Sequence, residues 1–185
     1  MACSGRVRAP SRLHAARERL IGRACRPLRQ AGSGRGRGSG ACRATDGKKC
    51  YELSLEEKLA QAGGKVVVID NYDSFTYNLC QYLGDLKCPY IVFKNDEATT
   101  DQLRDAKPSG ILISPGPGTP EESGMSLEAV EKLGPEFPLF GVCLGHQCIG
   151  QIFGGNIIRA KCGVMHGKTS PVFHKDIGIL KGLSR

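Results

Sequence analysis

The residue of this 185-residue sequence with the clearest chemical potential is Cys143, which lies in the segment 141–145, Gly-Val-Cys-Leu-Gly. A short apolar run of strand character, residues 138–140, precedes it, and helix-forming residues follow it. A tight turn from strand to helix with flanking glycines is typical of a nucleophile elbow, which exposes its central side chain at the edge of a sheet. Unpaired amide N–H groups and the helix dipole at such a turn favour a thiolate. The sequence therefore predicts a nucleophilic cysteine here, and the alternative is a buried cysteine that packs as a small apolar residue.

Two further segments carry polar groups that could act beside this sulfur. The N–H of Leu144 is placed to stabilise an oxyanion. The loop of residues 115–118, Pro-Gly-Pro-Gly, is a candidate second donor, because proline stiffens the chain and glycine leaves its N–H bare and accessible. Gln147 follows the cysteine by one helical turn and could present its amide to a polar substrate. His146 is a weaker candidate for a catalytic base, since a histidine in that helix is also expected simply to be solvated.

The elements around these segments alternate between strand and helix. Short β-branched or apolar runs at residues 66–69, 90–93, 110–114 and 139–142 predict strands, and apolar residues at helical spacing between them predict helices, as in residues 75–86. This order is typical of an α/β fold with an open, doubly wound, mainly parallel sheet. We also expect strands at residues 156–159 and 166–173. Functional loops of such a sheet lie at the carboxyl ends of its strands, where the turn at Asp70, the proline-glycine loop and Cys143 all fall, and this favours the elbow over a buried cysteine.

The charge of the chain is concentrated at its N-terminus. Residues 1–50 contain 11 Arg and 2 Lys against two acidic residues, whereas the remaining residues carry a net charge of −3. A basic leader of this composition, rich in Ala, Gly and Ser, predicts a disordered transit peptide. An Arg/Gly RNA-binding tail is the alternative, and it is disfavoured because no aromatic residues are interleaved. Residues 51–64 are expected to form a linker or short helix, and residues 65–185 the folded domain. We expect no membrane span and no nucleic-acid partner.

The cysteines indicate a reducing compartment. The sequence has nine of them but no Cys-x-x-Cys pair. Cys80, Cys88, Cys148 and Cys162 lie in apolar segments and are expected to be reduced core residues.

Five segments together resemble a known family. They occur in order at residues 70–79 (DNYDSFTYNL), 95–97 (NDE), 114–120 (SPGPGTP), 141–147 (GVCLGHQ) and 166–168 (HGK). From about Lys65 onward the chain resembles the class I (triad) glutamine amidotransferases of flavodoxin-like fold. The first and last of these segments narrow the resemblance to the glutaminase components of anthranilate synthase and of 4-amino-4-deoxychorismate synthase, and the former are favoured.

The resemblance implies a role for each site residue. Cys143 would attack the carboxamide of glutamine and form a thioester with release of ammonia. Leu144 and Gly118 would donate to the oxyanion. The glutamine site would comprise Gly116, Pro117, Gly118 and Gln147. His166, Gly167 and Lys168 would lie near the partner subunit.

The resemblance also implies a pathway and a partner. Ammonia would pass to anthranilate synthase component I, the chorismate-using subunit, in tryptophan biosynthesis. No metal or cofactor is expected in this subunit, and Mg²⁺ is expected on the partner. The leader then points to a plastid, with the mitochondrion as the alternative. The competing interpretation, from a different class of function, is a binding module without catalytic activity.

One departure from the family pattern concerns the C-terminus. Family members continue through a Ser-Leu-bearing loop and a His-x-Glu segment that supplies the catalytic base and its orienting acid, and neither occurs before Arg185. We therefore expect a fold that is incomplete at the C-terminus and a 185-residue chain with little or no glutaminase activity. His174 and Asp176 have His-x-Asp spacing but are expected to belong to a surface turn.

Overall fold

The computed structural model describes residues 53–163, 165 and 167–183, which belong to two separate units. The larger unit extends to Asn156, and the smaller unit includes residues 157–185. No helix in the described part of the chain has the length and apolar character needed to cross a membrane. The expected roles of residues 1–50 and of His166 fall outside the described residues.

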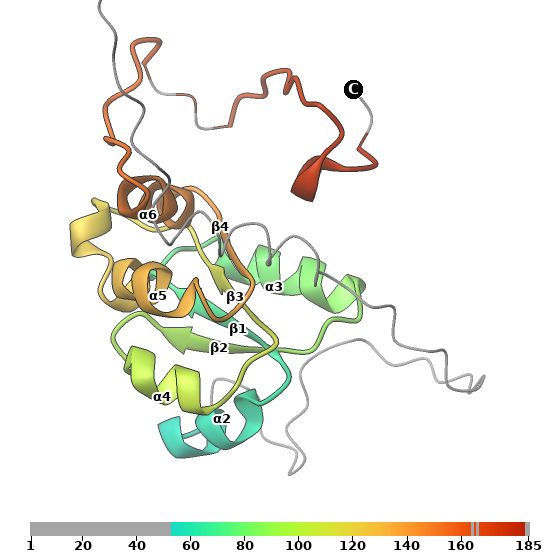
Figure 1. Cartoon of the computed structure of the whole chain (residues 1–185), viewed down its shortest axis with the longest axis vertical. Helices are drawn as coiled ribbons and strands as arrows, with labels where there is room; N and C mark the ends of the chain where they lie inside the picture. The colour runs from blue at the N-terminus through green and yellow to red at the C-terminus, as the bar shows by residue number, and fades with distance from the viewer. Residues whose placement is uncertain (1–52, 164, 166, 184–185) are drawn as a thin grey trace, which may run out of the picture. The chain divides into compact units, whose positions relative to one another are not determined.

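The larger unit is built on one parallel sheet (Figure 1). Its four strands are β1 (Val66–Asp70), β2 (Tyr90–Lys94), β3 (Gly110–Ile113) and β4 (Leu139–Gly141). They lie in the order β2-β1-β3-β4, and every neighbouring pair is parallel. Val66 is opposite both Tyr90 and Gly110, so the carboxyl ends of β1, β2 and β3 lie at one edge. This arrangement confirms the predicted doubly wound α/β fold.

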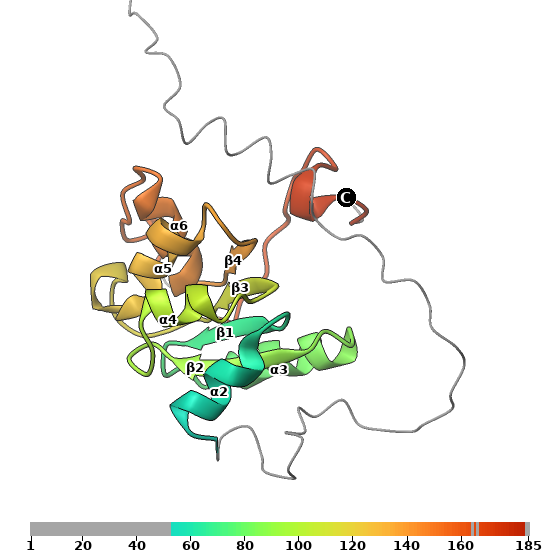
Figure 2. The same ribbon diagram turned by 60° about the horizontal axis from the view of Figure 1, so that its bottom comes forward.

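Helices cover both faces of this sheet (Figure 2). They are α2 (Leu55–Ala62), α3 (Thr76–Asp85), α4 (Thr100–Asp105), α5 (Met125–Leu133) and α6 (Leu144–Ile152). Side chains of β1 alternate between the faces: Val67 and Ile69 pack in the larger core with α2, α4, α5 and α6, and Val68 packs with Cys80 of α3.

Two helices of the larger core begin at capping boxes. Ser54 Oγ accepts a hydrogen bond from Glu57 N–H ahead of α2, and Thr99 does the same with Gln102 ahead of α4. In each case an oxygen of the Glu or Gln side chain accepts a hydrogen bond from the backbone N–H of the cap residue, so two otherwise unpaired N–H groups are satisfied. Helix α2 therefore has a defined start and packs on the core through Ala62. The start of the folded domain at Lys65 stays a prediction.

Two predicted strands are wrong. Residues 156–159 and the described part of 166–173 contain no strand, and side chains such as Ile158 and Phe173 are exposed. A strand needs a neighbour to take up its N–H and C=O groups, and a short apolar run does not specify one. The described residues 157–183 contain one short 3-10 helix, η3 (Gly178–Leu180).

Burial also differs from expectation in α3 and at one cysteine. Leu79 and Leu83 of α3 pack against the smaller core, but Phe75, Tyr82 and Leu86 are exposed. Helical spacing predicted this helix correctly, yet only part of its apolar surface faces the sheet. Cys162, expected in the core, is exposed.

Candidate active site

Cys143 occupies the turn between β4 and α6 in a backbone conformation that side chains rarely adopt. Its φ and ψ are 51° and −105°, and its side chain is exposed. Positive φ at a non-glycine residue costs of order 1–3 kcal/mol and persists only where the surrounding structure enforces it. The carbonyl of Cys143 accepts a hydrogen bond from Gln147 N–H at 3.0 Å, so α6 begins immediately after the cysteine. This geometry is that of a strained elbow and not of a buried core cysteine.

The flanking glycines allow the strand and the helix to approach closely. A Cβ atom on Gly145 would lie 2.6 Å from the carbonyl oxygen of Ile113 in β3. A Cβ atom on Gly141 would lie 2.3 Å from the carbonyl carbon of Gly145. Neither position leaves room for a side chain, so the first turn of α6 packs directly against β3 and β4. The side chain of Cys143, between the two glycines, is exposed.

The proline-glycine loop that follows β3 lies against this elbow. A Cβ atom on Gly116 would be 2.7 Å from Leu144 Cδ2 and 2.5 Å from Asn71 Cβ. Gly116 is thus held between the loop after β1 and the first residue of α6. Two segments 28 positions apart in sequence, Gly116 and Leu144, are therefore in contact at the carboxyl edge of the sheet.

Gly118 lies further along the loop with φ +80°, and a Cβ atom there would lie 2.6 Å from Glu122 Oε2. Glu122 Oε2 also accepts a bond from Thr119 N–H at 3.0 Å, which closes the turn into the 3-10 helix η2 (Pro120–Glu122). Pro117 is exposed and Gln147 is half-buried. The structure brings Gly116 and Leu144 together and gives no direct contact between Gly118 and the elbow.

Both predicted oxyanion donors carry free amide groups. Within residues 53–163, the N–H groups of Gly118 and Leu144 donate no hydrogen bond to a protein atom. The first N–H groups of a helix have no partner inside it, so that of Leu144 is available to an anion. The N–H of Leu144 directly follows the exposed cysteine in the chain, and an unpaired donor in that position can stabilise the tetrahedral intermediate of acyl transfer.

The other described cysteines of the larger unit are poor nucleophiles. Burial raises the pKa of the Cys80 thiol to about 11. Burial also raises the pKa of Cys148, although a hydrogen-bond contact with Ser123 opposes that effect. Both thiols are protonated at neutral pH, because desolvation disfavours the charged form. Cys88 is half-buried, which leaves Cys143 as the exposed thiol among residues 53–156.

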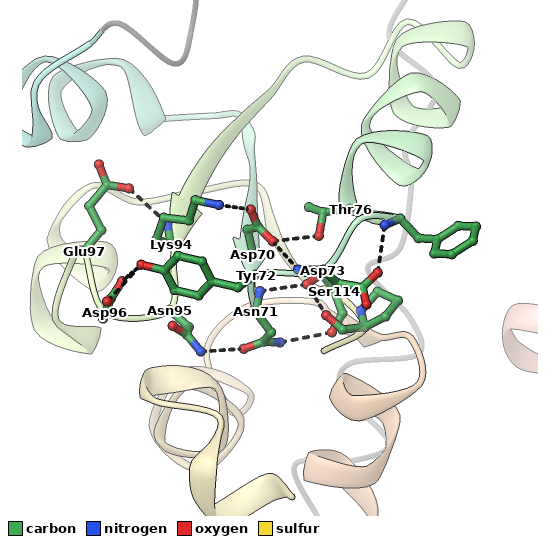
Figure 3. Close-up of polar contacts among 12 residues, drawn as sticks. Asp70, Asn71, Tyr72, Asp73, Thr76, Lys94, Asn95, Asp96, Glu97 and Ser114 are labelled. Carbon is green, nitrogen blue, oxygen red and sulfur yellow. Dashed lines mark hydrogen bonds and ion pairs between the residues drawn. The ribbon is translucent and has the colours of Figure 1, made fainter. Parts of the chain in front are cut away.

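A buried polar network lies beneath the loops, and the sequence analysis did not identify it (Figure 3). Asn71, at the end of β1, donates from Nδ2 to the carbonyl of Ser114 at 3.0 Å and from its backbone N–H to Ser114 Oγ at 2.9 Å. Asn95 Nδ2 donates to Asn71 Oδ1 at 3.1 Å, and Ser126 Oγ donates to the same oxygen at 2.7 Å. The only signal in the sequence was the polar run after β1, because these partners lie 24 to 55 positions away.

A charged pair adjoins this network. Asp70 Oδ2 accepts a hydrogen bond from Lys94 Nζ at 2.6 Å, and Asp70 Oδ1 accepts one from Thr76 Oγ1 at 2.7 Å. Burial opposes ionisation of Asp70, but the bonds from Lys94, Thr76 and the Asp73 N–H outweigh it and lower the pKa of this carboxyl. Asp70 is therefore an anion that ties β1 to β2 and α3.

Tyr72 lies on the outer side of the same cluster with φ 59°. Its hydroxyl donates to the Asp96 carboxylate at 2.8 Å, and Lys94 Nζ lies 4.5 Å from its ring centroid. The hydrogen bond to Asp96 raises the pKa of Tyr72. These contacts hold an exposed aromatic side chain in a strained conformation at the carboxyl edge of the sheet.

Within residues 53–156, no histidine is hydrogen-bonded to Cys143 Sγ. Cys148 Sγ lies 3.5 Å from Ser123 Oγ, and Cys162 Sγ donates to the Gly163 carbonyl. His146 is exposed on α6. His174 Nδ1 accepts a hydrogen bond from Asp176 N–H at 3.2 Å within a turn of residues 157–183. Gly167 and Lys168 are exposed in that smaller unit, which is not placed relative to the elbow.

No group of three or more His, Cys, Asp or Glu side chains in the described residues could hold a metal ion.

A parallel doubly wound sheet whose fourth strand ends in an exposed, strained cysteine defines an α/β protein of the nucleophile-elbow type. The model of the glutamine amidotransferase class-I family matches residues 67–185. The chain belongs to this family, as the resemblance in the sequence indicated.

Curated relatives are similar over the same region. The chain is 55% identical over 134 residues to "Anthranilate synthase beta subunit 2, chloroplastic" of Arabidopsis thaliana, with 71% of this chain and 49% of the relative covered. It is 55% identical over 119 residues to "Anthranilate synthase component 2" of Pseudomonas aeruginosa, with 64% and 59% covered. It is 51% identical over 118 residues to "Aminodeoxychorismate/anthranilate synthase component 2" of Bacillus subtilis, with 64% and 60% covered. The chain spans about half the length of the plant relatives that it matches.

Proposed function

We propose that this chain belongs to the glutamine amidotransferase subunit of an anthranilate synthase, which releases ammonia from glutamine for a chorismate-using partner. The observation that carries the proposal is the elbow: Cys143 is exposed at φ 51°, and Gly116 is packed against Leu144 beside it. The relatives from Arabidopsis thaliana and Pseudomonas aeruginosa are named as anthranilate synthase subunits, which supports this reaction. The proposed pathway, tryptophan biosynthesis, is the one that the family resemblance implies. The partner is then component I of the synthase.

In the proposed reaction the Cys143 thiolate attacks the carboxamide carbon of glutamine. The new C–S bond forms as the carbonyl π electrons move to oxygen, and the resulting oxyanion accepts hydrogen bonds from the N–H groups of Leu144 and Gly118. Collapse of this intermediate breaks the C–N bond and, with a proton added to the nitrogen, releases ammonia and leaves a γ-glutamyl thioester. Water then attacks the thioester, which yields glutamate and restores the thiolate.

Glutamine would bind along the loop after β3 and the first turns of α6. Gly116, Pro117 and Gly118 expose backbone that a substrate can approach, and Gln147 offers a side-chain amide one turn beyond the sulfur. His166, Gly167 and Lys168 are proposed to contact the partner subunit. No metal or cofactor is proposed for this subunit.

The proton transfers need a base near the sulfur. Within residues 53–156, no side chain is hydrogen-bonded to Cys143 Sγ. We therefore expect the 185-residue chain alone to release little or no ammonia. Robust turnover by this chain that survives Cys143→Ser would contradict both this expectation and the site.

The decisive experiment uses the protein expressed from its complete coding sequence, mixed with the synthase subunit and chorismate. With glutamine as nitrogen donor, the wild-type mixture should form anthranilate, and Cys143→Ser should lower that rate by about 10³-fold or more. With an ammonium salt in place of glutamine, both proteins should support the same rate. Loss of the ammonium-dependent reaction as well, or full glutamine-dependent activity in the variant, would overturn the proposal.

A second candidate product is 4-amino-4-deoxychorismate. The Bacillus subtilis relative is named for both products, so similarity at this level does not separate them. The same glutamine assay with each type of synthase partner, and with the product identified, distinguishes the two.

The basic composition of residues 1–50 and the word "chloroplastic" in the names of the plant relatives support import into a plastid. A fluorescent protein fused after residue 50 should reach plastids. Accumulation in mitochondria would instead favour the alternative compartment.

A further inference from the structure

The side chain of Asn71 sits where the three loops of the site meet, although it contacts no substrate in the proposed reaction. It lies at the carboxyl end of β1 and is 2% exposed. Figure 3 shows it between Ser114, which precedes the proline-glycine loop, and Asn95, which follows β2. A buried amide that is this well satisfied fixes the groups around it, because leaving any of those bonds unmade carries a desolvation penalty.

Asn71 holds the start of the proline-glycine loop from two sides. Its Nδ2 donates to the Ser114 carbonyl and its backbone N–H donates to Ser114 Oγ, and that hydroxyl donates in turn to the Pro115 carbonyl at 2.6 Å. The direction in which the chain leaves β3 is therefore set by the residue that follows β1.

The side chain of Asn71 also packs against the proline-glycine loop. A Cβ atom added to Gly116 would lie 2.5 Å from Asn71 Cβ and 2.7 Å from Leu144 Cδ2, so Gly116 packs directly against both side chains. The distance between the proline-glycine loop and the first residue of α6 thus depends on the position of the Asn71 side chain against which Gly116 packs.

The network reaches the elbow helix by a second route. Asn95 Nδ2 also donates to the Ser123 carbonyl at 3.1 Å, and Ser123 Oγ lies 3.5 Å from Cys148 Sγ on α6. The contacts that begin at Asn71 therefore connect the proline-glycine loop to the helix that starts with Leu144.

We propose that Asn71 is a positioning residue that sets the proline-glycine loop against the cysteine elbow, so that the two oxyanion donors face one site. This inference rests on the proposed function, because the positioned groups are those that would stabilise the oxyanion. Asn71 acts through Ser114, Gly116 and Asn95 and makes no contact with substrate.

The test compares two reactions of Cys143 in the protein expressed from its complete coding sequence. Hydrolysis of glutamine develops an oxyanion, whereas alkylation by iodoacetamide displaces iodide at a saturated carbon and develops none. Asn71→Ala should lower kcat for glutamine by about 10- to 100-fold, because misplacement of a donor by about 1 Å has an effect of that size. The rate of Cys143 alkylation should stay within about twofold of the wild-type rate.

Thr76→Val is the matched control. Thr76 is fully buried in the neighbouring cluster and loses one hydrogen bond to Asp70, but it has no bond to Asn71. Its variant should be destabilised while keeping kcat for glutamine near the wild-type value. If it loses kcat as Asn71→Ala does, the effect is one of general stability and the proposal is overturned.

A milder variant keeps the test decisive if Asn71→Ala does not fold. Ser114→Ala removes the acceptor of the Asn71 backbone N–H and the bond from Ser114 Oγ to the Pro115 carbonyl, but it keeps the Asn71 side chain and its bond to the Ser114 carbonyl. It should lower kcat by about three- to tenfold with alkylation unchanged. Wild-type kcat in either folded variant, or parallel loss of hydrolysis and alkylation, overturns the positioning role alone. A wild-type protein that releases no ammonia from glutamine overturns the proposed function and this inference with it.

Discussion

At the scale of single residues, Cys143 combines backbone strain with side-chain exposure. Its φ of 51° is unfavourable for any residue with a Cβ, and its exposed side chain recovers little by packing. A residue selected for stability at this turn would be glycine. We therefore infer that the strained conformation is kept because it exposes the thiol of Cys143.

A comparison of two substitutions at Cys143 tests this interpretation. Both Cys143→Gly and Cys143→Ala remove the thiol, but only glycine removes the Cβ, so we expect the glycine variant to be more stable by about 1 kcal/mol after its greater unfolded-state entropy is included. Urea unfolding of the two proteins measures the difference. Equal stabilities, or a more stable alanine variant, would show that the elbow is not strained.

At the scale of elements, the hydrophobic patterns predicted the four strands, the helices between them and the elbow at Cys143. These features are local, since a β-branched run or a Gly-x-Cys-x-Gly turn carries its structure in adjacent residues. The network around Asn71 could not be predicted, because it joins residues 24 to 55 positions apart. The strands expected at 156–159 and 166–173 were wrong for the same reason, since a strand depends on a partner elsewhere in the chain.

The ion pair between β1 and β2 gives a prediction at this scale. Removal of Lys94 leaves the Asp70 carboxylate buried without its main partner, so Lys94→Met should lower the free energy of unfolding by about 1–3 kcal/mol at pH 7. Lys132 pairs with Glu128 on the surface of α5, with both side chains more than two-fifths exposed. Lys132→Met should therefore change stability much less than Lys94→Met does.

The pH dependence follows from the directions of the shifts. The pKa of Asp70 is below its ordinary 3.8 in the folded protein, so its stabilisation is complete above that pH and is lost as pH falls through the lower folded value. Burial lowers the pKa of Lys94, but the hydrogen bond to Asp70 outweighs burial and raises this pKa above its ordinary 10.5. The stabilisation that charged Lys94 provides is therefore lost only as pH rises beyond 10.5. The deficit of Lys94→Met should be constant through neutral pH and shrink below about pH 4. A deficit unchanged at pH 3, or equal to that of Lys132→Met, would contradict the assignment.

At the scale of the whole molecule, the question is where the folded unit begins. Helix α2 contributes Ala62, fully buried, to the larger core, and Lys58 forms a 2.5 Å ion pair with Glu97 after β2. Loss of α2 would uncover the core cluster in which Ala62 packs with Ile91 and Phe93 of β2. The expected leader, residues 1–50, ends before Ser54, the cap of α2, so its removal should leave this cluster intact.

Two deletions separate the possibilities. Removal of residues 1–50 should leave the free energy of unfolding within about 0.5 kcal/mol of that of the intact chain, as expected for a transit peptide. Removal of residues 1–64 should lower it by about 2–4 kcal/mol, because buried apolar area and a partly buried ion pair are lost. If the two shortened chains are equally stable, α2 is a linker and the domain begins at Lys65.

The most direct measurement of the central claim is the identification of the covalent intermediate. The protein expressed from its complete coding sequence is mixed with glutamine, quenched in acid within the first turnovers and digested for mass spectrometry. We predict a glutamyl group on the peptide that contains Cys143, removable by hydroxylamine and absent from Cys143→Ala and from samples given asparagine. Release of ammonia from glutamine without this adduct, or a glutamyl group on another cysteine, would contradict the account.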